Sequence, residues 1–176
     1  MVFPDQFIHN GNDMERLELF MRSDALADEE AIEPLLKTAD LTRQLISAQA
    51  YDDLSVFIRY TIQEEYYEAF SWILEVVQEE YDRPDAALPA EAACDLGRSI
   101  RNYDAFAARL QFDPAVLQNG FEKVYDEHRE VDSFFNISVH RTGYSHIYLV
   151  TEENFDTRDN DYIRYRLLFR KEPWYP

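Results

Sequence analysis

Five residues near the C-terminal end of the chain carry side chains that could catalyse a reaction together. His140 and His146 are imidazoles, which exchange protons near neutral pH. Arg164 and Arg166 can each hold a phosphate or carboxylate through paired hydrogen bonds, and Tyr148 offers a hydroxyl. Such a set would support phosphodiester or phosphoester cleavage, with the two histidines as general acid and general base.

For this chemistry the five side chains must share one face of a β-sheet. Apolar and polar residues alternate in 133–150 and again in 162–170, which is the period of strands with one buried face. Residues 141–143 end in glycine and predict a three-residue hairpin loop. That loop sets Ser138 opposite His146, so that both histidines lie on the polar face of a sheet of about three antiparallel strands.

The same face is also what an ordinary solvated sheet presents. Antiparallel sheets commonly leave one face to water, where arginines cover tyrosine rings and pair with acidic residues of the helices. No motif of known spacing accompanies the five residues, so we favour a solvated face and assign no catalytic residue. We expect no cofactor and no metal site, because two histidines supply at most two ligands and Cys94 is the one cysteine. The acidic loop at 156–161 lacks the glycine and terminal glutamate of a calcium loop.

The composition predicts one folded domain over residues 1–176. Apolar residues make up 46% of the chain and aromatic residues 15%, which excludes intrinsic disorder. No apolar run approaches the roughly 20 residues of a membrane helix, and the first residues do not resemble a signal peptide. We therefore expect a cytoplasmic protein that does not bind membranes.

The net charge of −18 is unevenly distributed along the chain. Residues 1–131 hold 11 Lys/Arg against 28 Asp/Glu, whereas residues 132–176 hold 6 against 7. Such a field repels nucleic acid and anionic membranes and favours a basic partner. The acidic surface is therefore expected to bind a basic protein and not to bind nucleic acid directly.

The acidic part, 1–131, has the periodicity of helices. Apolar residues recur at helical spacing in a series of about six segments, and the strongest pattern is that of 64–81. Residues 89–103 and 113–131 are expected to be two of these helices; the second would carry His128 on its apolar stripe and the first would bury Cys94. Helices followed by a small antiparallel sheet, 132–176, predict an α+β fold in which the helices pack on the sheet.

A row of glutamates marks the helix expected at 64–81. Glu64, Glu68, Glu75 and Glu79 lie nearly opposite its apolar stripe, and no lysine or arginine occurs between Glu64 and Glu80. Most charged stripes are simply solvated, but uncompensated charge lowers folding stability through self-repulsion. We therefore interpret these four glutamates as a surface that binds a partner.

These observations favour a non-enzymatic acidic binding protein that neutralises a basic protein partner. Inhibitors and immunity proteins of this kind include some that imitate the charge of nucleic acid. The alternatives are a small phosphoesterase- or nuclease-like enzyme that uses the polar sheet face, and a structural or assembly subunit. Nucleotide-binding, serine-hydrolase, zinc-protease and thioredoxin motifs are all absent from the sequence, which favours the first hypothesis.

Overall fold

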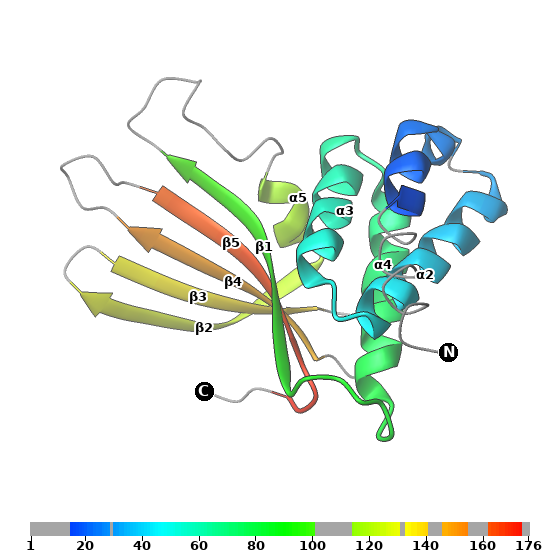
Figure 1. Ribbon diagram of the computed structural model, residues 1–176. Coiled ribbons are helices and arrows are strands. Elements are labelled where there is room, and N and C mark those ends of the chain that lie inside the picture. The colour runs from blue at the N-terminus through cyan, green and yellow to red at the C-terminus, as the bar shows by residue number, and fades with distance from the viewer. Residues whose placement is uncertain are drawn as a thin grey trace. The chain divides into compact units, whose positions relative to one another are not determined.

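The chain divides into two compact units, an N-terminal unit (residues 1–88) and a C-terminal unit (residues 89–176). The computed structural model describes residues 15–28, 30–100, 114–130, 133–140, 146–154 and 162–173. Each unit has its own secondary structure, helical in the first and mainly β in the second (Figure 1). The single domain expected over 1–176 stays a prediction.

The N-terminal unit consists of helices joined by short turns. After a helix at 15–22 come the 3₁₀ turn η1 (Ala25–Ala27), α2 (Ile32–Ser47), α3 (Tyr51–Gln63) and α4 (Tyr67–Asp82). α2 and α4 run in the same direction and pack against each other, and α3 runs the opposite way beside them (Figure 1). The three helices pack on one another around side chains that are at most 3% exposed, which include Ala39, Leu41, Leu45, Ile46, Leu54, Phe57, Ile58, Ile62, Ala69, Ile73, Leu74, Val76, Val77 and Tyr81.

The turn between α3 and α4 uses a glutamate where glycine is usual. Glu65 has a φ of 63°, in the left-handed region. The Tyr66 N–H donates to the carbonyl of Thr61 at 2.7 Å, and the Glu65 N–H donates to that of Ile62 at 3.2 Å. This is a Schellman motif, which caps the last carbonyls of a helix. The helix expected at 64–81 therefore begins later, at Tyr67.

The C-terminal unit is a five-stranded antiparallel sheet in the order β1-β5-β4-β3-β2. Its elements are β1 (Glu91–Ile100), α5 (Pro114–Asn119), β2 (Phe121–Glu130), β3 (Ser133–His140), β4 (Ile147–Asn154) and β5 (Tyr162–Arg170). The first strand of the unit pairs with the last, so β1 and β2 form the two edges (Figure 1).

The two faces of the sheet differ in their side chains. The core face, as we call it, is buried and carries Cys94, Leu96, Phe121, His140, Ile147, Leu149, Tyr165, Leu167 and Phe169. The opposite face, which we call the arginine face, carries Asp95, Ile137, Tyr148, Val150, Glu152, Arg164, Arg166, Leu168 and Arg170. On it, Ile137, Tyr148 and Val150 form a small buried cluster flanked by Tyr125, Val139 and Leu168.

The α+β class predicted from the sequence is confirmed, but the number of elements is not. The sheet has five strands instead of about three, and the described residues form five α-helices, at 15–22 and in α2, α3, α4 and α5, instead of about six. Two segments expected to be helices, 89–103 and 113–131, contain the strands β1 and β2. Cys94 is buried as expected, although in a strand. His128 lies on β2, and its side chain is outside the described part.

The predicted hairpin register is wrong. Ser138 pairs with Leu149 and Val139 with Tyr148, whereas we expected Ser138 opposite His146. This shift of three positions is odd, and an odd shift exchanges the faces of the two strands. The expected loop at 141–143 and the acidic loop at 156–161 lie outside the described residues.

Candidate functional site

The two histidines of the catalytic hypothesis fall on opposite faces of the sheet. His140 ends β3 on the core face and is 9% exposed, with its ring 5.7 Å from that of Phe121 in a T-shaped contact. His146 precedes β4, and its carbonyl accepts the N–H of Arg170, so the alternation places it on the arginine face. It is 4% exposed. The structure does not bring the two imidazoles together as an acid–base pair.

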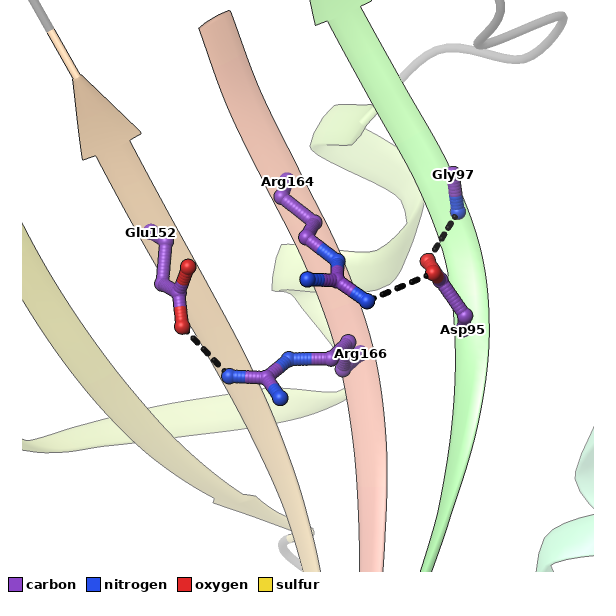
Figure 2. A network of polar contacts seen from close by, with 5 residues as sticks. All are labelled: Asp95, Gly97, Glu152, Arg164 and Arg166. Carbon is purple, nitrogen blue, oxygen red and sulfur yellow. Dashed lines mark hydrogen bonds and ion pairs between the residues drawn. The ribbon is translucent and has the colours of Figure 1, made fainter.

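The arginines of the same hypothesis are paired with carboxylates of neighbouring strands. Arg164 Nη2 donates to Asp95 Oδ2 at 2.8 Å, and Arg166 Nη2 donates to Glu152 Oε1 at 2.5 Å (Figure 2). Arg170 Nε lies 3.5 Å from Glu91 Oε2. The partners are strand residues rather than the helical acids that we expected.

Two further features reduce the chemistry available on the arginine face. Burial raises the pKa of Asp95, but hydrogen bonds from Arg164 and the Gly97 N–H together lower it below its usual value (Figure 2). Asp95 is therefore a carboxylate that holds Arg164 in place. Tyr148 is 3% exposed and belongs to the apolar cluster, so its side chain is packed rather than presented to a substrate.

We predict that the Arg166–Glu152 pair stabilises the sheet. Both side chains are less than a third exposed, at 29% and 27%. Arg166→Met should lower the free energy of unfolding by about 1–2 kcal/mol, between the values typical of surface and buried pairs. Chemical denaturation followed by circular dichroism measures the change.

The exposed pair Lys123–Asp126 is the matched control for Arg166→Met. Lys123 Nζ lies 3.0 Å from Asp126 Oδ2, and the two side chains are 58% and 59% exposed. Lys123→Met should change the same free energy by less than about 0.5 kcal/mol. Equal effects of the two substitutions would show that the network in Figure 2 contributes no more than a surface pair.

Three of the four glutamates proposed for partner binding share one face of α4. Glu68, Glu75 and Glu79 are exposed and lie within roughly 40° of one another at about 100° per residue. Glu64 does not belong to this row, since it is the C-cap residue of α3. Glu79 Oε2 lies 3.8 Å from Arg43 Nη2 on α2, so the end of the row is partly neutralised.

Two exposed hydrophobic residues lie on the face of α2 that carries Arg43. Ile32 and Leu36 are 55% and 54% exposed and share a face of α2 with Arg43, again within roughly 40°. The Arg43–Glu79 ion pair joins this face to the row on α4, and both helices run the same way (Figure 1). Leu36 therefore lies on the same face of α2 as Arg43, roughly two turns before it. Sequence patterning did not identify this apolar pair.

The acidic charge of the protein is concentrated in the N-terminal unit. Residues 1–88 contain 20 Asp/Glu and 6 Lys/Arg, a balance of −14, and residues 89–176 contain 15 and 11, a balance of −4. Charge repulsion of this size favours association with a basic partner.

An open groove lies between the helix at 15–22 and α3, with a volume of about 490 Å³. Met21, Val56 and Tyr60 contribute apolar surface to it, and Arg22 and Arg59 contribute positive charge. Sequence reasoning missed this groove, because neither arginine belongs to a motif. Only the packing of two separate helices brings them together.

Two tyrosines next to the groove connect the ends of three helices. The Tyr60 hydroxyl donates to the carbonyl of Met21 at 3.0 Å, and the Tyr66 hydroxyl donates to Asp24 Oδ1 at 2.6 Å. The bond to Asp24, with burial second, raises the pKa of Tyr66 well above its usual value. Burial, followed by the negative charges of Asp24 and Glu64, raises the pKa of Tyr60.

We predict that the N-terminal unit loses stability in alkali through Tyr66. A raised folded-state pKa means that the neutral phenol is favoured in the folded protein, so its stabilisation is complete below about pH 10 and is lost at higher pH. Tyr66→Phe should lower the free energy of unfolding by about 0.5–1 kcal/mol at neutral pH. It should also make the decline of that free energy above about pH 10 less steep. Urea unfolding at a series of pH values tests this. A decline of unchanged steepness in Tyr66→Phe would contradict it.

No family model matches the chain, and neither curated proteins nor solved structures gave a match to it. Within the described ranges, no helix is both long and apolar enough to cross a bilayer. In the same part of the chain, no group of three or more His, Cys, Asp or Glu side chains could hold a metal ion. The protein is of the α+β class and has a five-stranded antiparallel sheet.

Proposed function

We propose that the protein is a non-enzymatic acidic binding protein that neutralises a basic protein partner, as inhibitors and immunity proteins do. The observation that carries this proposal is the charge of the N-terminal unit, where 20 acidic residues stand against 6 basic ones. Four of those six form ion pairs within the unit, which are Arg16–Asp40, Arg22–Glu18, Arg43–Glu79 and Arg83–Glu80. The surplus of carboxylates is thus open to an external cation.

The surface formed by α2 and α4 is the best candidate for the contact. It combines exposed carboxylates, at Glu68 and Glu75, with exposed apolar side chains, at Ile32 and Leu36. Protein interfaces typically have an apolar centre and a polar rim, where charges steer association and the apolar centre supplies much of the affinity. A basic segment with one apolar side would match this surface.

The spacing of the glutamates supports charge complementarity rather than imitation of a nucleic-acid strand. Glu68, Glu75 and Glu79 span roughly 16 Å along α4 at 1.5 Å per residue. Phosphates follow one another every 3.4 Å or so along one strand of DNA, several times more densely. We therefore place nucleic-acid mimicry below a general role in binding basic proteins.

Titration of salt against binding tests the proposal. The full chain would be mixed with a panel of basic proteins, including small nucleases and histones, at about 30 mM salt and again at about 300 mM. We expect binding to at least one member at low salt, with a dissociation constant that rises steeply as salt is added. No binding at low salt, or binding indifferent to salt, would overturn it.

The two alternatives have less support. The enzyme hypothesis needs His140 and His146 on one face, and the register puts them on opposite faces. The assembly hypothesis would use exposed apolar residues such as Ile32 and Leu36 between copies of the chain. Sedimentation of the protein alone separates that case, because self-association would be visible without any basic partner.

A further inference from the structure

We propose that the groove between the helix at 15–22 and α3 binds a small amphipathic carboxylate, that is, one carboxylate group on an apolar body. This site is separate from the α2–α4 surface and does not depend on the function proposed above. Its volume of about 490 Å³ falls within the range of about 300–1,000 Å³ usual for small-molecule sites.

The arginines of the groove are the least engaged cations of the N-terminal unit. Arg59 forms no ion pair or hydrogen bond with any residue that the structure describes, although the unit holds 20 acidic residues. Arg22 lies 4.0 Å from Glu18 with side chains 78% and 53% exposed, which is a weak surface pair. Lys37, the remaining cation without a carboxylate, lies over the ring of Phe20 instead. Arg59 is therefore available to an incoming anion, and Arg22 is engaged only by this weak pair with Glu18.

Glu18 and Gln63 are the other polar residues of the groove, and Met21, Val56 and Tyr60 supply the apolar surface on which a ligand body would lie. Val56 is 41% exposed, so its side chain is accessible to a ligand in the groove. Tyr60 donates its hydroxyl to the Met21 carbonyl at 3.0 Å, so its ring is the part offered to a ligand. Burying Val56 and the Tyr60 ring against an alkyl or aryl group removes apolar surface from water.

The charge of the unit decides which anion fits. With a balance of −14, the N-terminal unit repels anions, and this repulsion increases with the charge of the ligand. A carboxylate carries one negative charge and accepts paired hydrogen bonds from a guanidinium group, whereas a phosphate monoester carries nearly two at neutral pH. Arg59 and Arg22 should therefore select a monocarboxylate over a phosphate monoester.

Binding of octanoate to the full chain tests this site, with octanol and octyl phosphate as comparison ligands. Titration calorimetry, or NMR shifts of the Val56 methyl groups, should show octanoate binding at least about tenfold more tightly than either comparison ligand. If octanol bound as tightly as octanoate, the arginines would have no role in binding. If octyl phosphate bound more tightly than octanoate, the choice of a carboxylate would be overturned.

Matched variants identify the residues of the site. Arg59→Gln should weaken octanoate binding about tenfold, whereas Arg83→Gln, which removes a cation at the end of α4 outside the groove, should not. Glu68→Gln should also leave octanoate binding unchanged, so this test is independent of the basic partner. An unchanged affinity in Arg59→Gln would overturn the proposal, provided that circular dichroism shows a folded variant.

Discussion

Replacing Glu68 and Glu75 together by glutamine should weaken binding of the basic partner by roughly 3- to 30-fold at low salt. Each exposed charge pair contributes up to about 1 kcal/mol, and 1.4 kcal/mol corresponds to about tenfold. Both glutamates are exposed on α4, and neither forms an ion pair with a residue of the described part of the chain. The loss should come mainly from slower association, since charges at the rim of an interface act on the encounter. Surface plasmon resonance measures both rates.

Glu122 and Glu172 provide the control for the charge itself. Both are exposed and belong to the C-terminal unit, so replacing them by glutamine removes the same net charge from elsewhere. That variant should change affinity by less than about twofold if the effect is local. Equal losses in the two variants would mean that only net charge matters and that α4 is not the contact.

The exposed apolar pair of α2, Ile32 and Leu36, gives an independent test in the same binding experiment. Ile32→Ser and Leu36→Ser remove exposed hydrophobic surface without changing charge. They should weaken binding by a factor that salt does not alter, because the contribution is hydrophobic. Full affinity in both variants would restrict the contact to charges on α4.

Sequence patterns predicted the helical character of the N-terminal unit, although the number of helices in the chain was wrong. α2, α3 and α4 have continuous apolar stripes, and local contacts define most of their geometry. The boundary error at Glu64 has a specific cause. The left-handed position that ends α3 is usually occupied by glycine, and here it is occupied by Glu65.

β1 and β2 could not be predicted from local patterns because distant pairing decides them. Cys94 and Leu96 alternate as strand residues do, but Cys94 pairs with Leu167, about 70 positions later in β5, and Leu96 lies at the register shift between Asp95 and Gly97. In β2, Phe121 and Val124 fit a helical spacing, and the strand begins directly after Gly120. Glycine inside a helix costs about 1 kcal/mol of stability, so Gly120 is a signal that a helix ends there. The helical spacing of the apolar residues obscured this signal.

The hairpin register failed because both faces of the sheet bury apolar side chains. The predicted register, with Ser138 opposite His146, assumed one buried apolar face and left the other face to water. Ile137 instead packs with Tyr148 and Val150 on the arginine face, while Ile147 lies on the core face. Alternation specifies a register only where a single face is buried.

The candidate sites depended on packing even more than the strands did. The sequence identified the acidic region. Of the four glutamates predicted to bind a partner, the structure places three on the exposed face of α4. The exposed apolar residues of α2, Ile32 and Leu36, were not predicted. Whether a leucine such as Leu36 is covered depends on which helix packs over it. Arg59 likewise became notable only because no described carboxylate reaches it.

Phe57→Ala should lower the free energy of unfolding by about 3–5 kcal/mol, a large part of the 5–15 kcal/mol or so typical of a whole protein. Phe57 is fully buried in α3, and its ring makes an edge contact with Phe20 at 6.1 Å. The neighbouring Val56, which is 41% exposed, is the matched control. Val56→Ala should cost less than about 1 kcal/mol. If Phe57→Ala does not fold, Phe57→Leu gives a smaller effect in the same direction.

The same substitution tests whether residues 1–176 form one domain. Leu167 is fully buried at the centre of the C-terminal sheet, and Leu167→Ala should cost about 2–5 kcal/mol. A single domain unfolds in one cooperative transition, so Phe57→Ala and Leu167→Ala would each move the same calorimetric peak. Two peaks, each answering to one substitution only, would instead show that the units fold independently. In that case the acidic N-terminal unit could be expressed alone, and its binding could be measured without the sheet.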